Sequence, residues 1–236
     1  MIHVALSPTE IRRFAALNLD GVTAIVFDVL RATSSIVTGL AHEVTRFIPV
    51  ATIEEAQALK QTDPSVVLAG ERGGLPIEGF DIGNSPSEFA ELASRTVVMT
   101  TTNGTFAIKS VSHASRVYIG ALVNLDALAD VIFRTRPKRL LLVCAGTGDE
   151  FSLEDAIGAG ALIARLPDDS GLSDAAIMAR SLYERVGDDM LEWFRHTRNG
   201  RSLLKIGKGA DLVDCAQVSR YDVTGILQGD AVVAVK

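Results

Sequence analysis

The sequence contains few of the residues on which disulfide-rich, metal-thiolate and nucleic-acid-binding proteins depend. Two cysteines among 236 residues are too few for a disulfide framework or a thiolate metal site. Aromatic residues make up only 6% of the chain, so platforms that stack nucleic-acid bases are not expected. The net charge is −6 and no Lys/Arg-rich run occurs, which argues against a basic face that binds nucleic acid.

Long hydrophobic runs are also missing. The longest apolar stretches, such as residues 140–145, are far shorter than the about 20 residues that cross a membrane. The first residues, MIHVALSP, include no basic segment and no long apolar segment of the kind found in signal peptides. We therefore expect a cytoplasmic protein that has neither a membrane nor a nucleic acid as its partner.

The chain does have the composition of a protein with a dense core. Hydrophobic residues make up 47% of the sequence and charged residues 22%, which excludes extensive disorder. No repeat, low-complexity linker or clear boundary divides the chain. We expect a single domain over residues 1–236, in which the more charged residues 167–205 could form a helical insertion or cap.

Short β-branched runs alternate along the chain with helical patterns. The expected strands cover residues 2–5, 22–27, 43–49, 65–69, 96–100, 116–119, 139–144 and 231–235. The expected helices cover residues 9–17, 34–41, 53–62, 86–93, 104–111, 124–134, 153–166, 174–184, 188–196 and 210–217. Because the strands are continuously apolar and alternate with helices, the fold class is α/β with a layered sheet.

Four of the expected strands run directly into clusters of polar residues. These clusters are residues 28–35, 70–88, 101–105 and 145–155. In open α/β sheets, ligands bind beyond the carboxyl ends of the strands. Four polar clusters at equivalent positions therefore predict one composite pocket.

The residue types in these clusters suit a phosphorylated ligand. Arg31 and Arg72 offer planar forks that match phosphate, sulfonate or carboxylate groups. Residues 101–104 begin an expected helix, where hydroxyl and backbone N–H groups can bind an anion. The clusters also hold carboxylates of the kind that Mg²⁺ prefers, namely Asp28, Glu71, Asp81, Glu154 and Asp155. Together they suggest phosphoryl transfer or phosphate-ester hydrolysis.

Each of these residues also has a purely structural interpretation. The carboxylates could stabilise helix starts, and the arginines could form ion pairs within the protein. Residues 84–85 and 101–105 could be ordinary helix caps, since Pro86 and Glu88 follow Ser85 in the pattern of a helix start. Cys144 is expected to be buried and structural, because a cysteine phosphatase would need an arginine where this chain has Glu150.

Taken together, four motifs resemble the 2-phosphosulfolactate phosphatase family. They are FDVLRATSSIVTGL, GERGGLPIEGFDIGNSP, TTNGT and CAGTGDEFSLEDAIGAGAL, which occur in the family's order between residues 22 and 166. The resemblance implies a three-layer α/β/α fold with a mixed sheet. It also implies a magnesium-dependent acid phosphatase that hydrolyses 2-phospho-3-sulfolactate to 3-sulfolactate and phosphate, a step of coenzyme M biosynthesis.

Roles within these motifs are hypotheses that accompany the resemblance. The metal ligands would be Asp28 with one or both of Glu154 and Asp155. The residues that contact the anionic groups would be Arg31, Arg72, Asn84, Ser85, Thr101, Thr102, Asn103 and Gly104. Glu71 or Asp81 would position the attacking water, or Asp28 would itself attack the phosphorus; the sequence leaves both routes open.

Other functions stay open at this point. The chain could be a phosphatase of another small phosphorylated carboxylic acid, or a non-catalytic protein that binds a small anion. A nucleotide- or sugar-phosphate transferase is disfavoured because the sequence contains no nucleotide-binding fingerprint. A homodimer is expected only because it is the commonest oligomer among soluble proteins.

Overall fold

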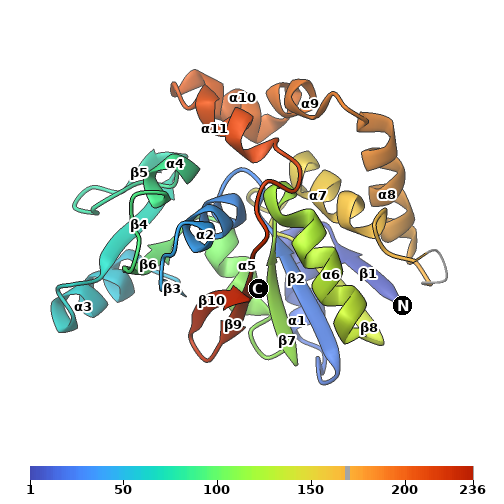
Figure 1. Cartoon of the computed structure of the whole chain (residues 1–236), viewed down its shortest axis with the longest axis horizontal. Coiled ribbons are helices and arrows are strands. Elements are labelled where there is room, and N and C mark those ends of the chain that lie inside the picture. Colours follow the sequence, from blue (N-terminus) through green and yellow to red (C-terminus); the bar gives the residue numbers. More distant parts are fainter. Residues whose placement is uncertain (168–170, 236) are drawn as a thin grey trace.

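A computed structural model of the chain describes residues 1–167 and 171–235. Within these residues a mixed sheet of ten strands carries helices on both faces (Figure 1). The strands are β1 (Ile2–Ala5), β2 (Val22–Phe27), β3 (Arg46–Pro49), β4 (Val67–Arg72), β5 (Leu75–Pro76), β6 (Thr96–Thr100), β7 (Arg116–Gly120), β8 (Arg139–Cys144), β9 (Thr224–Gln228) and β10 (Ala231–Val235).

The helices follow the strands in the alternation that the sequence predicts. They are α1 (Pro8–Ala15), α2 (Ala32–Ala41), α3 (Ile53–Thr62), α4 (Pro86–Phe89), α5 (Gly104–Ser110), the 3₁₀ turn η1 (Leu122–Asn124), α6 (Leu125–Thr135), α7 (Leu153–Ile163), α8 (Asp174–Val186), α9 (Met190–His196), α10 (Arg198–Lys205) and α11 (Gly209–Cys215). Among these described residues, no helix is long and apolar enough to span a bilayer.

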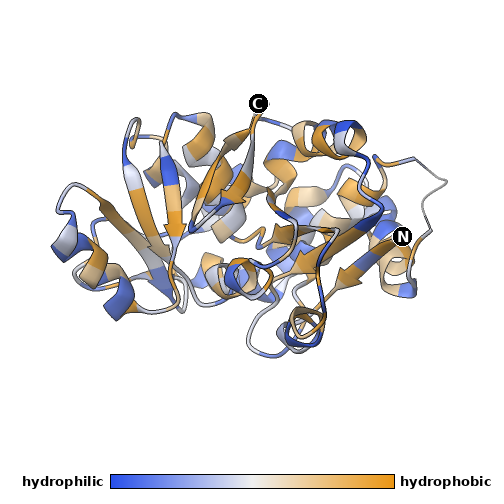
Figure 2. Ribbon diagram, turned by 90° about the horizontal axis from the view of Figure 1, so that it is seen from below, coloured by the Kyte–Doolittle hydropathy of each residue, from blue (hydrophilic) through white to orange (hydrophobic). Residues whose placement is uncertain are grey.

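The sheet consists of two parallel groups joined by an antiparallel hairpin. Its strand order is β1-β8-β2-β7-β9-β10-β3-β6-β4-β5. Strands β1, β8, β2 and β7 are mutually parallel, and so are β3, β6 and β4. The hairpin β9–β10 lies between them and pairs antiparallel with β7 on one side and with β3 on the other. Because all three pairings of the hairpin are antiparallel, the two groups run in opposite directions through the ladder. The accumulated twist of the sheet also inclines their strands steeply to each other (Figure 2).

Apolar residues alternate between the two faces of the sheet and build a core on each. On β2, Ala24 and Val26 face the layer that contains α1, α2 and α5, whereas Ile25 and Phe27 face α6, α7 and α8. A smaller cluster around Ala56 covers the second face of β4 and β6 beneath α3. Figure 2 shows this apolar interior along the strands. The expected three-layer α/β/α fold with a mixed sheet is confirmed.

The segment that was expected to be a helical insertion or cap contains α8, α9 and α10. Residues 168–170 of that range lie outside the described residues. Helix α8 packs against α7, and α9 to α11 contact one another while α11 also contacts α4. In Figure 1 the last three helices cross the top of the molecule, above the start of α2.

Candidate active site

The ends of several strands meet around a cavity of about 220 Å³. Its lining residues come from the loops after β2, β4, β6 and β8 and from helix α10. They are Asp28, Leu30, Arg31, Glu71, Gly73, Gly74, Asn84, Thr102, Asn103, Thr147, Arg198, Asn199, Ser202, Leu203 and Ile206. The four polar clusters of the sequence thus converge, and the two parallel groups of strands both contribute to one pocket.

Asp28 follows the last residue of β2 and lines this cavity. Its Oδ1 atom accepts a hydrogen bond from the backbone N–H of Ala32 at 3.2 Å, which also stabilises the start of α2. Its Oδ2 atom lies against Gly104, where an added Cβ would come within 2.6 Å. Burial, followed by the negative charge of Glu71, raises the pKa of Asp28 to about 7.

Glu71 connects the loops that follow β4 and β6. Its carboxylate accepts hydrogen bonds from the backbone N–H groups of Thr102 at 2.8 Å and Gly74 at 2.7 Å. These bonds occupy two of the carboxylate's acceptor positions and leave others for a ligand or water. Glu71 therefore holds both loops in place while it faces the cavity beside Asp28.

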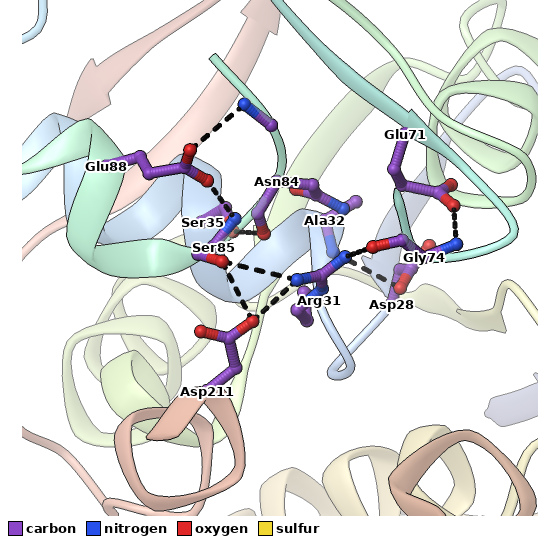
Figure 3. Close-up of polar contacts among 11 residues, drawn as sticks. Asp28, Arg31, Ala32, Ser35, Glu71, Gly74, Asn84, Ser85, Glu88 and Asp211 are labelled. Carbon is purple, nitrogen blue, oxygen red and sulfur yellow. Dashed lines mark hydrogen bonds and ion pairs between the residues drawn. The ribbon is translucent and has the colours of Figure 1, made fainter. Parts of the chain in front are cut away.

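Arg31 is locked by a buried network that the sequence did not predict (Figure 3). Its Nη1 atom lies 2.5 Å from Oδ2 of Asp211 on α11 and 3.3 Å from the hydroxyl of Ser85. Its Nη2 atom donates to the carbonyl of Gly74 at 2.7 Å. The Ser85 hydroxyl donates in turn to Asp211 at 3.0 Å. The network ties the C-terminal helices to the loops after β2 and β4.

Asn84 presents an unpartnered oxygen within the buried part of the site. Its backbone carbonyl accepts a hydrogen bond from Ser35 at 2.9 Å, and the following residue, Ser85, is fixed when its N–H donates to Glu88 at 2.9 Å. The side chain is 4% exposed, yet its Oδ1 atom has no hydrogen-bond partner among the described residues. A buried amide oxygen of this kind is suited to a cation, a water or a ligand donor.

Asp155 joins the loops after β2 and β8. Its two carboxylate oxygens accept hydrogen bonds from the N–H groups of Val29 at 2.8 Å and Gly146 at 3.0 Å. Burial and the neighbouring charges of Asp28 and Glu154 raise the pKa of Asp155 well above its usual value. Asp155 connects these two loops, and neither it nor Glu154 is among the residues that line the cavity.

Glu154, Thr147 and the first residues of α10 form a second polar network. Asn199 donates to the Glu154 carboxylate at 2.5 Å and to the Thr147 hydroxyl at 2.8 Å. Burial raises the pKa of Glu154. Arg198 donates to the Thr147 carbonyl at 2.8 Å and forms an ion pair with Glu150. Helix α10 thereby places Arg198 and Asn199 over the cavity.

Several residues that the sequence singled out do not line the cavity. The carboxylate of Asp81 accepts hydrogen bonds from Leu68 N–H at 2.7 Å and from the Lys60 ammonium at 3.0 Å, at a half-exposed position. Arg72 donates to the carbonyl and the hydroxyl of Thr100. The structure therefore does not bring these two residues into the pocket with Asp28, and their predicted roles stay predictions.

Some residues at the start of α5 stabilise the helix, and others line the cavity. The Thr101 hydroxyl accepts a hydrogen bond from Thr105 N–H at 3.1 Å, and the Thr105 hydroxyl accepts one from Thr101 N–H at 3.1 Å. Thr102 and Asn103 line the cavity, whereas Gly104 packs against Asp28. Cys144 is completely buried, and burial raises the pKa of its thiol well above the usual value, as expected of a structural cysteine.

No motif or spacing pointed to the residues that the C-terminal helices contribute, namely Asp211, Arg198 and Asn199. All three lie in segments of ordinary polar composition. Asp211 is 126 and 180 residues from its partners Ser85 and Arg31, and Arg198 and Asn199 are 45 to 52 residues from theirs in the loop after β8 and the start of α7. Helix α10 itself was not predicted, because its sequence RNGRSLLK contains a glycine and few apolar residues. Only the folded chain shows that these residues close the pocket.

The oxygen atoms of the site fit a magnesium ion. Asp28, Glu71 and the unpartnered Asn84 carboxamide all line the cavity, and Mg²⁺ is commonly held by one or two carboxylates together with water and substrate phosphate. Burial and the repulsion from Glu71 raise the pKa of Asp28, and a bound cation would offset both effects. Among the described residues, no group of three His, Cys, Asp or Glu side chains forms a complete metal cage.

The fold and the cavity define an α/β protein with a polar ligand site where the carboxyl ends of strands from two parallel groups meet. The 2-phosphosulfolactate phosphatase family model matches residues 8–230. The chain belongs to this family, as the four motifs indicated.

Curated relatives give the same family. A protein of Caldicellulosiruptor saccharolyticus is 40% identical over 209 residues, which cover 84% of this chain and 86% of the relative. A protein of Clostridium acetobutylicum is 38% identical over 222 residues and 92% of each chain. A protein of Deinococcus radiodurans is 40% identical over 201 residues and 83% of each chain. Each is named "Probable 2-phosphosulfolactate phosphatase".

Proposed function

We propose that this chain hydrolyses 2-phospho-3-sulfolactate to 3-sulfolactate and phosphate, with Mg²⁺ as its cofactor. The observation that carries the proposal is the buried carboxylate of Asp28, which lines the cavity with a pKa of about 7 beside Glu71 and Arg31. A group of this pKa can accept and release protons near neutral pH. The family match and the names of the relatives support the substrate.

The cavity suits the size and chemistry of such a substrate. The proposed substrate carries a phosphate, a carboxylate and a sulfonate on three carbons, so it needs several donors and little apolar surface. Thr102, Asn103 and Asn199 offer polar groups in the lining, and Arg198 offers a cation. Small anions are held by hydrogen bonds from charged and polar groups of this kind.

The proposed reaction replaces the ester oxygen on phosphorus with an oxygen from water. In one route, water attacks the phosphorus, its proton passes to Asp28 or Glu71, and the departing sulfolactate oxygen gains a proton. In the other, an oxygen of Asp28 bonds to phosphorus as the ester bond breaks, and water then cleaves the aspartyl phosphate. Asp28 must be ionised when it attacks phosphorus or accepts the proton of water, which its pKa allows near and above neutral pH.

Mg²⁺ would be held by Asp28, with Glu71, Glu154 and the Asn84 oxygen as neighbouring donors. When bound, it would neutralise phosphate charge and polarise the phosphorus. Asp155 would contribute by holding the loops after β2 and β8 through its two amide contacts. Glu71 would keep the loops after β4 and β6 around the phosphate.

Phosphate release is the test of this proposal. The enzyme should release phosphate from 2-phospho-3-sulfolactate with Mg²⁺ but not with a chelator, and faster than from 2-phospholactate or phosphoglycerates. Release from the carboxylates alone would keep a phosphatase with another substrate. Release from none of these esters by folded protein with Mg²⁺ would favour a non-catalytic anion-binding protein. Trapping with hydroxylamine would distinguish an aspartyl phosphate from direct attack by water.

The wider setting of the reaction is part of the same proposal. It would be a step of coenzyme M biosynthesis in the cytoplasm, carried out by a single domain without nucleic acid. Helices α9 to α11 would act as the cap of the pocket, and two copies of the chain would form a homodimer. Light scattering of the purified protein tests the dimer, and a single species at the monomer mass would remove it.

A further inference from the structure

The cavity is lined by two arginines, and one of them is already neutralised. Among the described lining residues, the cations are Arg31 and Arg198. The Arg31 and Asp211 side chains are only 2% and 4% exposed, and Ser85 bonds to both of them. A ligand could displace Asp211 only by leaving a buried carboxylate unpaired, which is strongly unfavourable. Arg31 therefore contributes hydrogen bonds to the site but little net positive charge.

Arg198, unlike Arg31, forms its ion pair at the surface of the protein. Its partner Glu150 is 73% exposed, and the Arg198 side chain is itself 51% exposed. Such a pair is screened by water and contributes little to stability, so an anionic ligand can replace Glu150 readily. The hydrogen bond from Arg198 to the Thr147 carbonyl would remain and would keep the guanidinium at the cavity.

Arg198 is anchored in a different loop from the residues that contact Asp28. Asp28, where the chemistry is proposed, packs against Gly104 at the start of α5 and against the first turn of α2. Arg198 is instead anchored to Thr147 and Glu150, in the loop after β8. In the proposed substrate the phosphate oxygen and the carboxylate are both bonded directly to C2, whereas a CH₂ group separates the sulfonate from C2.

We infer that Arg198 binds the sulfonate of the substrate. It would thereby favour 2-phospho-3-sulfolactate over phosphorylated carboxylic acids that lack a sulfonate, such as 2-phospholactate. The inference rests on the proposed function for its substrate, but it concerns a residue of α10 outside the four motifs. The guanidinium retains N–H donors beyond those used by Thr147 and Glu150, and its planar fork suits a sulfonate. Arg198 determines specificity and is not a catalytic residue.

The test compares substrates that differ only in the sulfonate. For Arg198→Gln, kcat/KM on 2-phospho-3-sulfolactate should fall by roughly 10- to 100-fold, as expected for loss of a charge-assisted hydrogen bond. The value for 2-phospholactate, which lacks the sulfonate, should change less than about 3-fold. Arg201→Gln is the matched control, because Arg201 lies on the same helix, is exposed, and its side chain donates to the His196 carbonyl outside the cavity lining.

The outcomes separate this inference from the proposed function. Equal losses on both substrates, or no loss on the sulfonated one, would overturn the role of Arg198 while the phosphatase remained. If the wild type hydrolyses neither ester, calorimetry with 3-sulfolactate and lactate replaces kinetics. Binding of 3-sulfolactate that Arg198→Gln weakens about 10-fold or more, with lactate unaffected, would support the inference; binding independent of Arg198, or no binding of 3-sulfolactate by the wild type, would overturn it.

Discussion

Arg31 and Asp211 form a buried ion pair, with Nη1 and Oδ2 only 2.5 Å apart, across 180 positions of the chain. The pair connects the residue before α2 to helix α11 and lies beside the candidate catalytic carboxylate. It therefore joins the C-terminal helices to the part of the sheet that carries Asp28 (Figure 3).

Substitution of Asp211 by Asn should be strongly destabilising. It would leave Arg31 buried without its counter-charge, and removal of one partner of a buried pair costs about 3 to 5 kcal/mol. We expect the free energy of unfolding in urea to fall by an amount in that range, with a loss of phosphatase activity under conditions where the variant is folded.

The matched control is Asp214→Asn on the same helix. Asp214 lies 3.7 Å from Arg220, and both side chains are at least one third exposed. Its substitution should change the free energy of unfolding by about 0.5 kcal/mol or less. Similar effects of the two substitutions would show that the buried pair does not anchor α11.

Substitution of Asp28 by Asn should abolish turnover and yet stabilise the metal-free protein at alkaline pH. Because the folded-state pKa of Asp28 is about 7 against a usual value of 3.8, folding favours the protonated carboxyl, and the wild type loses stability as pH rises between these values. At pH 8 the variant should exceed the wild type by about 1 to 4 kcal/mol, since one pKa unit corresponds to about 1.4 kcal/mol.

The pH dependence supplies the check on this prediction. At pH 4, below the range in which the ionised form accumulates in the folded protein, the two proteins should differ little in urea denaturation. A difference that does not grow from pH 4 to pH 8 would contradict the burial of an ionisable Asp28. With saturating Mg²⁺ the wild type should recover stability at pH 8, while Asp28→Asn should gain less.

Substitution of Asn84 by Leu should weaken ligand binding without lowering the free energy of unfolding. The variant removes a buried oxygen that has no partner among the described residues, so the free energy of unfolding should stay the same or rise by about 1 kcal/mol. Mg²⁺ or substrate binding, measured by calorimetry, should weaken by about 10-fold or more. The control is Asn124→Leu.

Asn124 is equally buried, but its side chain is fully engaged. It accepts from Ala121 N–H at 2.9 Å and donates to the Ile119 carbonyl and the Thr224 hydroxyl, both at 3.1 Å. Its replacement should lower the free energy of unfolding by about 2 kcal/mol or more, because the former partners lose their hydrogen bonds. Equal destabilisation by both substitutions would mean that Asn84 is structural.

Substitution of Gly104 by Ala should displace Asp28. The new Cβ would lie 2.6 Å from both Asp28 Oδ2 and the Ala32 Cβ, so one of them must move. A displacement of about 1 Å can lower turnover roughly 100-fold, and overpacking costs about 1 to 3 kcal/mol. Gly209→Ala serves as the control, because its Cβ would meet only the end of the flexible Leu204 side chain at 3.2 Å. Unchanged kcat for Gly104→Ala would argue against close packing at Asp28.

Local patterns predicted most of the fold. Strands β1, β2, β6, β8 and β10 begin and end where the sequence placed them, because each is a short run rich in apolar and β-branched residues. Strand β9 was missed, since its sequence TGILQ contains a glycine and pairs only after the chain returns to the centre of the sheet. Strand β3 begins later than expected, because Glu43 has a positive φ of 65° at the end of the preceding turn.

The site was predictable where it depends on strand ends and not where it depends on distant helices. Asp28, Glu71, Asn84, Thr102 and Asn103 line the cavity because the twisted sheet brings the strand ends of its two groups together. Asp81 belongs to the same glycine-rich segment but turns back to bind Lys60 and Leu68, which composition alone could not indicate. The partner of Arg31 could not be predicted, because no spacing relates it to α11.

The hairpin between the two parallel groups has a consequence for how the protein is made. The candidate site takes Asp28 from one group and Glu71 from the other, and β9–β10 provides the strands that join them. Residues 224–235 leave the ribosome after every residue that lines the cavity. Two half-sheets with exposed edges must therefore coexist during synthesis, and a competent pocket can form only when this late hairpin inserts between them.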